Sequence, residues 1–135
     1  MTSSPSDRPS EAPRRSRLAP CPDRPNCVST ETTDPRHRMR PIPFRGAGEL
    51  ALERMATVIG AQPRAAVRHR ERGWLHAEFR SRLLGYVDDV DVEVDDDAGV
   101  LRFRSASRLG RWDLGVNRRR MKRLARAFRE AEEGG

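Results

Sequence analysis

The chain has 135 residues, the size of one domain with a single modest core. Its charged fraction of 35% nearly equals its hydrophobic fraction of 36%, a balance that predicts an unfolded segment attached to the folded part. The net charge of +7 raises nucleic acid and anionic membranes as partners, but Lys122 is the only lysine among 27 basic residues. Such an arginine bias fits genome-wide composition better than selection for phosphate binding.

Composition divides the N-terminal third of the chain into two parts. Residues 1–19 are rich in Pro, Ser and charge, and they predict a disordered tail because they cannot bury enough apolar surface to fold. Residues 20–45 contain many prolines and predict an ordered but irregular arm, which Ile42 and Phe44 anchor on the domain. A single folded domain is expected at residues 46–132.

The arm carries both cysteines, Cys21 and Cys27. No apolar run reaches membrane-spanning length and the N-terminus has no apolar signal segment, so we expect a cytoplasmic chain. In that compartment the thiols are expected to be free, although they are close enough in sequence to bridge if the arm curls. Together with His37 they lack the CxxC spacing of a zinc site, so neither a metal nor a cofactor is expected.

A first helix is predicted from Gly48 to Ile59. Its apolar residues recur at intervals of three and four and therefore share one stripe, which consists of Leu52, Met55, Ala56 and Ile59. Gly60 and Pro63 are expected to end this helix.

The first two predicted strands, residues 65–70 and 74–82, flank a turn that ends at Gly73. A two-residue turn would place His69 opposite His76, a pair suited to a metal ion. A one-residue slip moves every side chain to the other face, so the apolar residues decide the register, and they favour a three-residue turn with the two histidines on opposite faces. That turn aligns Ala65 with Phe79 and Val67 with Ala77.

Four-residue loops at residues 83–86 and 96–99 complete an antiparallel meander. They place side chains of three strands in rows on one face: Leu75-Val94-Leu101, Ala77-Val92-Phe103, Phe79-Val90-Ser105 and Ser81-Asp88-Ser107. The other face alternates acidic and basic strands, a pattern that predicts a solvated ladder of cross-strand ion pairs.

A second helix is predicted from Leu114 to Ala131, with Asp113 as its N-cap. Its apolar stripe contains Met121, Leu124, Ala125 and Phe128, and one turn earlier the stripe reaches Asn117. The predicted fold class is α+β, a four-stranded antiparallel meander with one N-terminal and one C-terminal helix packed on one face.

The apolar face of the sheet turns polar where the fourth strand meets the second helix. Buried polar groups need partners, so a hydrogen-bond network that ties sheet to helix is the favoured interpretation, and a ligand site is the alternative. A bound anion would also offset the arginines at the start of the helix. The candidate ligand-binding residues are Ser81, Asp88, Ser105, Ser107, Asp113, Asn117, Arg118 and Arg120.

Three functions are compatible with this cluster. We favour a small non-catalytic binding module that holds an anionic or polar ligand, or a partner's segment, at the junction. A hydrolase would use Asp88 with Ser105 or Ser107, but no histidine falls beside them to act as the base. A structural or assembly factor would dock its partner through the cysteine-containing arm. Nucleic acid is not expected, because aromatic residues make up only 5% of the chain and the arginines face aspartates.

Four stretches of the chain form long, specific motifs: CPDRPNCVS at 21–29, His37 with Pro41-Ile42, WLHAEFRSRLLGYVDDVDV at 74–92 and RSASRLGRWDLGVNRRR at 104–120. They resemble the domain-of-unknown-function family DUF1499 over about residues 21–126. That family has no established activity, so the resemblance implies a fold unit and a set of motif positions. These positions include Ser81, Asp88, Ser105, Ser107, Asp113 and Asn117.

Overall fold

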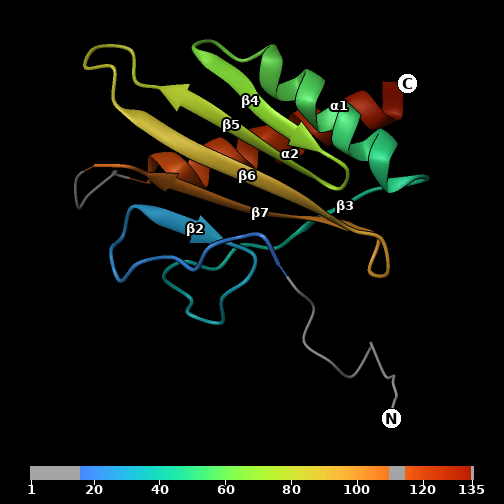
Figure 1. Cartoon of the computed structure of the whole chain (residues 1–135), viewed down its shortest axis with the longest axis horizontal. Helices are drawn as coiled ribbons and strands as arrows, with labels where there is room; N and C mark the ends of the chain where they lie inside the picture. Colours follow the sequence, from blue (N-terminus) through green and yellow to red (C-terminus); the bar gives the residue numbers. More distant parts are fainter. Residues whose placement is uncertain (1–15, 110–114, 135) are drawn as a thin grey trace.

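A computed structural model describes residues 16–109 and 115–134 as an antiparallel sheet with two helices on one of its faces (Figure 1). The sheet has the strand order β2-β7-β6-β5-β4, and β3 also pairs with β7. The strands are β2 (Cys27–Ser29), β3 (Ile42–Pro43), β4 (Ala65–Glu71), β5 (Trp74–Arg80), β6 (Val87–Asp95) and β7 (Val100–Ser107). The helices are α1 (Gly48–Gly60) and α2 (Val116–Gly134). The fold class is therefore α+β, as predicted.

The sheet has six strands rather than the predicted four, because the arm adds two short strands to β7. In β2, Val28 aligns with Ser105, and in β3, Ile42 aligns with Leu101. Without these strands β7 would present a row of unpaired backbone groups, the feature that proteins commonly cover at a sheet edge. Ile42 is buried, as expected for an anchor.

The core lies between the sheet and the two helices. α1 runs through its predicted span and buries Leu52, Met55 and Ile59. α2 buries Met121 and Phe128 and continues to Gly134, three residues beyond its predicted end. The predicted start of this helix at Leu114 and its predicted N-cap, Asp113, lie outside the described residues. Neither helix in the described part of the chain combines the length and the apolar character that crossing a membrane requires.

The predicted pairing of β6 with β7 is confirmed, but that of β5 with β6 is wrong by two residues. Phe79 faces Asp88 instead of Val90. A shift of two residues keeps every side chain on its predicted face, because side chains alternate along a strand. The rows that form are Leu75-Val92-Phe103, Ala77-Val90-Ser105 and Phe79-Asp88-Ser107.

The position of Gly85 in its loop explains this shift. Ser81 and Tyr86 close the loop with a backbone hydrogen bond of 2.8 Å, which leaves residues 82–85 between them. Gly85 therefore comes last in the loop, at a φ of 68° that favours glycine. Gly99 holds the same place between β6 and β7, at a φ of 67°. The predicted loop, residues 83–86, has Gly85 in its third position instead. This difference shifts the predicted pairing of β5 with β6 by two residues.

β4 pairs with β5 in two registers that are joined by an irregularity between Val67 and His69. Near the turn His69 faces His76, so the prediction that these histidines lie on opposite faces is wrong. Beyond the irregularity Val67 faces Ala77, as predicted. One extra residue in β4 therefore allows both a two-residue turn, with His69 opposite His76, and the predicted pairing of Val67 with Ala77 farther along the strands.

A disulfide joins Cys21 to Cys27, so the expectation of free thiols is wrong. Their Cα atoms lie 5.7 Å apart, within the usual range for a disulfide. The arm turns back on itself between them, where the amide of Arg24 donates to the carbonyl of Pro22.

Residues 16–19 lie against the face of the sheet opposite the helices, although we expected them to belong to the tail. The hydroxyl of Ser16 and the amide of Arg17 donate to the carboxylate of Glu93 at 3.0 and 2.8 Å. Leu18 is buried. Part of the face that we expected to be solvated is therefore covered.

Candidate functional site

Asn117 joins α2 to β7 through its amide group and is fully buried. Its Oδ1 accepts hydrogen bonds from Ser105 Oγ at 2.7 Å and from Arg120 Nη1 at 2.8 Å. Its Nδ2 donates to Ser107 Oγ at 3.0 Å and to the carbonyl of Asn26 at 3.1 Å. Every hydrogen-bonding group of this amide has a partner, as the network interpretation requires.

Arg120 extends the same network to β6. Its Nη2 donates to Asp88 Oδ2 at 2.7 Å, and its guanidinium lies 4.7 Å from the centre of the Phe79 ring. The side chains of Arg120 and Asp88 are only 8% and 13% exposed, so the pair forms a largely desolvated ion pair between helix and sheet. The charge of Arg120 is thus neutralised inside the protein.

The seven predicted candidate residues within the described segments separate into three groups. Asp88, Ser105, Ser107, Asn117 and Arg120 form the network just described. Ser81 is exposed at the loop before β6, where its Oγ accepts a hydrogen bond from the amide of Tyr86 at 2.9 Å. Arg118 points away from the network, and Asp113 lies outside the described residues.

Ser105 of this network is not placed for nucleophilic attack. Ser105 is fully buried, and its hydroxyl is engaged by Asn117 and Arg120. The three histidines in the described segments are bonded elsewhere: His37 to the carbonyl of Cys27, His69 to Glu71 and His76 to Asp91. The observed contacts therefore hold the sheet and the helix together and supply no base for the hydrolase alternative.

A groove of about 660 Å³ runs between α2 and the arm, next to the network. Its apolar lining includes Met39, Pro41 and Ala125, which are partly exposed. Six cationic side chains also line it: Arg38, Arg40, Arg118, Lys122, Arg126 and Arg129. We call this the basic groove.

Arg118 connects the two walls of the basic groove. Its guanidinium donates to the backbone carbonyls of Arg38 at 3.0 Å and Arg36 at 3.2 Å, which holds the arm against α2. The side chain of Arg36 is engaged by Asp34, and this hydrogen bond lowers the pKa of the Asp34 carboxyl to about 2. The carboxylate of Asp34 is thus directed to Arg36 rather than to the groove.

Most cations of the basic groove have no acidic partner among the residues that the structure describes. Within residues 16–109 and 115–134, no carboxylate forms an ion pair with Arg38, Arg40, Lys122, Arg126 or Arg129. Elsewhere on the surface, Arg102 and Arg108 are each bound to carboxylates. Unneutralised charge gathered in a hollow produces a positive potential that attracts anions.

The sequence contained one signal for this groove that the predictions missed. Arg118, Lys122, Arg126 and Arg129 follow one another at intervals of four, four and three residues, which is the spacing of one face of a helix. The contribution of Arg38 and Arg40 carried no such signal, because the path of the arm over the domain does not follow from a local pattern.

Comparisons with known proteins bear on the family rather than on the activity. No curated protein was found to match this chain. The family model described as "Protein of unknown function (DUF1499)" matches residues 17–128, a span that includes the arm, the sheet, α1 and most of α2. Because this match extends over most of the 135 residues, the chain belongs to the DUF1499 family.

Proposed function

We propose that the protein is a binding module that holds an anionic ligand with an apolar body in the basic groove. The observation that carries this proposal is the gathering, around an apolar floor, of cations that form no ion pair within residues 16–109 and 115–134. The groove adjoins the junction of β7 and α2, where the sequence predicted a candidate ligand site, and Arg118 belongs both to that predicted site and to the lining of the groove.

The charge of the ligand follows from the electrostatics of α2. Arg118, Lys122, Arg126 and Arg129 lie on one face, and like charges spaced four residues apart on a helix destabilise it. An anion in the groove would relieve the repulsion along this helix.

The apolar character of the ligand follows from the floor of the groove. Met39, Pro41 and Ala125 line the groove and are partly exposed, so they offer hydrocarbon surface between the guanidinium groups. A volume of about 660 Å³ falls within the range of roughly 300–1,000 Å³ that is typical of small-molecule sites. A charged head bound by the rim and a hydrocarbon body on the floor would use both surfaces.

In this proposal the buried network positions the groove instead of binding the ligand. Asn117 and Arg120 fasten the first turns of α2 to β6 and β7, and this fixes the direction of Arg118. Of the candidate residues that the sequence singled out, Arg118 would meet the ligand directly. Rigid support of this kind lowers the conformational cost of binding.

Isothermal titration calorimetry with n-octyl phosphate, below its critical micelle concentration, tests this function. The wild-type protein is expected to bind n-octyl phosphate more tightly than either inorganic phosphate or n-octyl glucoside, because only the first has both a charge and an alkyl chain. Reversal of two exposed rim charges, Lys122→Glu with Arg126→Glu, should weaken binding at least about tenfold, since a hydrogen bond to a charged group contributes roughly 1.5–3 kcal/mol.

The matched control reverses two exposed cations outside the groove, Arg24→Glu with Arg70→Glu, and alters the net charge equally. It should leave the affinity within about twofold of wild type after correction for long-range electrostatics. Equal loss in both double variants, or equal binding of n-octyl glucoside and n-octyl phosphate, would refute the proposal. Tight binding of a glutamate-rich peptide in place of n-octyl phosphate would assign the groove to a partner's segment.

A further inference from the structure

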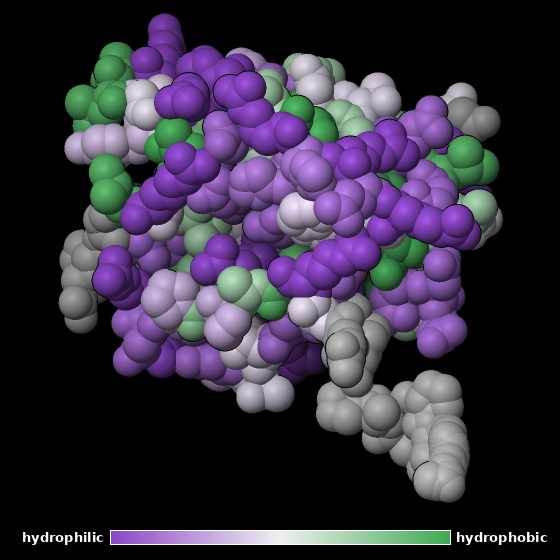
Figure 2. Space-filling view, in the orientation of Figure 1, coloured by the Kyte–Doolittle hydropathy of each residue, from purple (hydrophilic) through white to green (hydrophobic). Residues whose placement is uncertain are grey.

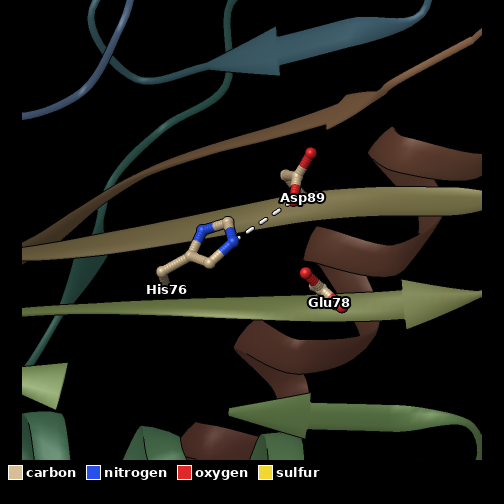
Figure 3. A group of neighbouring side chains, drawn as sticks. All are labelled: His76, Glu78 and Asp89. Carbon is tan, nitrogen blue, oxygen red and sulfur yellow. Dashed lines mark ion pairs between the residues drawn. The ribbon is translucent and has the colours of Figure 1, made fainter. Parts of the chain in front are cut away.

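The face of the sheet opposite the helices is largely hydrophilic across its middle (Figure 2). On this face His76 and Glu78 of β5 and Asp89 of β6 point to the same side, away from α2 (Figure 3). One ligand atom of each lies within 4.8 Å of the others. Glu78 and Asp89 are direct cross-strand partners, so the pairing of β5 with β6 builds the group.

Asp91 orients His76 within this group. His76 Nδ1 lies 2.9 Å from Asp91 Oδ1, while Nε2 lies 3.2 Å from Asp89 Oδ1. In metalloproteins a carboxylate bonded to one ring nitrogen of a ligating histidine fixes the ring and directs the other nitrogen to the metal. His76, with Asp91 behind it and Asp89 in front, has this arrangement.

Arg108 already demonstrates that the two carboxylates attract a cation. Its Nη2 lies 2.7 Å from Glu78 Oε2, and its Nε lies 2.8 Å from Asp89 Oδ2. The side chain of Arg108 is 47% exposed and can turn into solvent.

We propose that His76 Nε2, Glu78 and Asp89 bind a divalent transition-metal ion, with Zn²⁺ the preferred ion, in place of the Arg108 guanidinium. One imidazole and two carboxylates are donors that Zn²⁺ accepts, at roughly 2.0–2.2 Å, and three protein ligands leave a fourth position for water. Asp91 positions the imidazole and does not itself bind the ion.

His69 is not a ligand in this site although it faces His76 across the strands. Its Nε2 lies 2.7 Å from Glu71, and its ring packs 5.1 Å from that of Trp74. It serves as the matched control, because it is the other histidine on the same face. The two cysteines are bonded to each other and offer no thiolate to compete for the metal.

Calorimetric titration of the full chain, free of an affinity tag, with Zn²⁺ tests the proposal, and the visible absorption of Co²⁺ reports the coordination. The wild-type protein is expected to bind one ion. His76→Ala should weaken binding at least about tenfold, and Asp91→Asn should weaken it roughly 10–100-fold, the usual effect of losing an orienting partner. His69→Ala should leave the affinity unchanged.

Arg108→Ala separates a metal site from a surface ion-pair network. Removal of the competing guanidinium should tighten Zn²⁺ binding at least about tenfold if the ion and Arg108 use the same carboxylates. No binding of Zn²⁺ by the wild-type protein, no gain in Arg108→Ala, or equal losses in His69→Ala and His76→Ala would each overturn the proposal. Far-ultraviolet circular dichroism of every variant confirms that the sheet is retained.

Discussion

Asn117 uses both amide donors and its carbonyl oxygen to join α2 to β7 and to the backbone just before β2. Two periodicities in the sequence predicted that polar residues would meet here, the two-residue period of the strands and the 3.6-residue period of the helix. The ion pair between Asp88 and Arg120 was not predicted, because two residues in the same cluster can be paired in several ways and only packing selects one.

Asn117→Ala is expected to lower the free energy of unfolding by about 1–3 kcal/mol, because Ser105, Ser107 and Arg120 would each lose a partner in a buried place. Urea unfolding followed by circular dichroism measures this change. The matched control is Ser81→Ala, an exposed position that should change the free energy by less than about 0.5 kcal/mol. A loss for Asn117→Ala no larger than that of the control would show that the network contributes little to stability.

At the scale of elements, local patterns predicted α1 and the β6–β7 hairpin. The position of α1 was predicted from the spacing of its apolar residues. The register of the β6–β7 hairpin was predicted from the loop that ends at Gly99 and from the alternating residues around it. The predicted register of β5 with β6 was wrong because the two possible positions of Gly85 in the loop give registers that differ by two residues. Both registers bury the same side chains, so the alternation of apolar residues cannot distinguish them. β2 and β3 were missed because two or three residues of a Pro-rich arm show no alternation.

The start of α1 lies close to the β6–β7 hairpin, which makes Gly48 sensitive to substitution. A Cβ atom added there would collide with the side chains of Val94 and Asp96, whereas one added at Gly60 would meet nothing within 4 Å. Gly48→Ala should therefore destabilise the protein, although alanine favours a helix over glycine by about 1 kcal/mol. Gly60→Ala in the same helix should be neutral or stabilising by about 0.4–1 kcal/mol in thermal unfolding. Equal stabilisation by both changes would contradict the close approach.

The disulfide between Cys21 and Cys27 closes a short loop ahead of β2. For a loop of this length the chain-entropy model gives a stabilisation of about 2 kcal/mol, which reduction should remove. Urea unfolding with and without dithiothreitol measures this difference, and the double variant Cys21→Ser with Cys27→Ser should be insensitive to the reductant. Two free thiols per chain in protein purified without reductant would contradict the bridge.

At the scale of the whole molecule, positive charge is distributed unevenly over two surfaces. Arg102 and Arg108, on the face of the sheet away from the helices, are bonded to carboxylates, whereas most cations around the basic groove lack acidic partners within the described segments. Net charge alone did not predict this separation, because it depends on which arginine lies beside which carboxylate after folding. The arm and α2 are far apart in sequence, so the spacing of the cations along α2 does not by itself predict the groove between them.

The most direct test of the basic groove as a ligand site is an NMR titration that maps backbone amide shifts as n-octyl phosphate is added. We expect the largest shifts in residues 38–42 of the arm and residues 118–129 of α2, with little change on the face that carries His76. Saturable shifts confined to these two segments, and absent in Lys122→Glu with Arg126→Glu, are the predicted result. Shifts spread evenly over exposed arginines, or centred on residues 76–91, would contradict a ligand site in the groove.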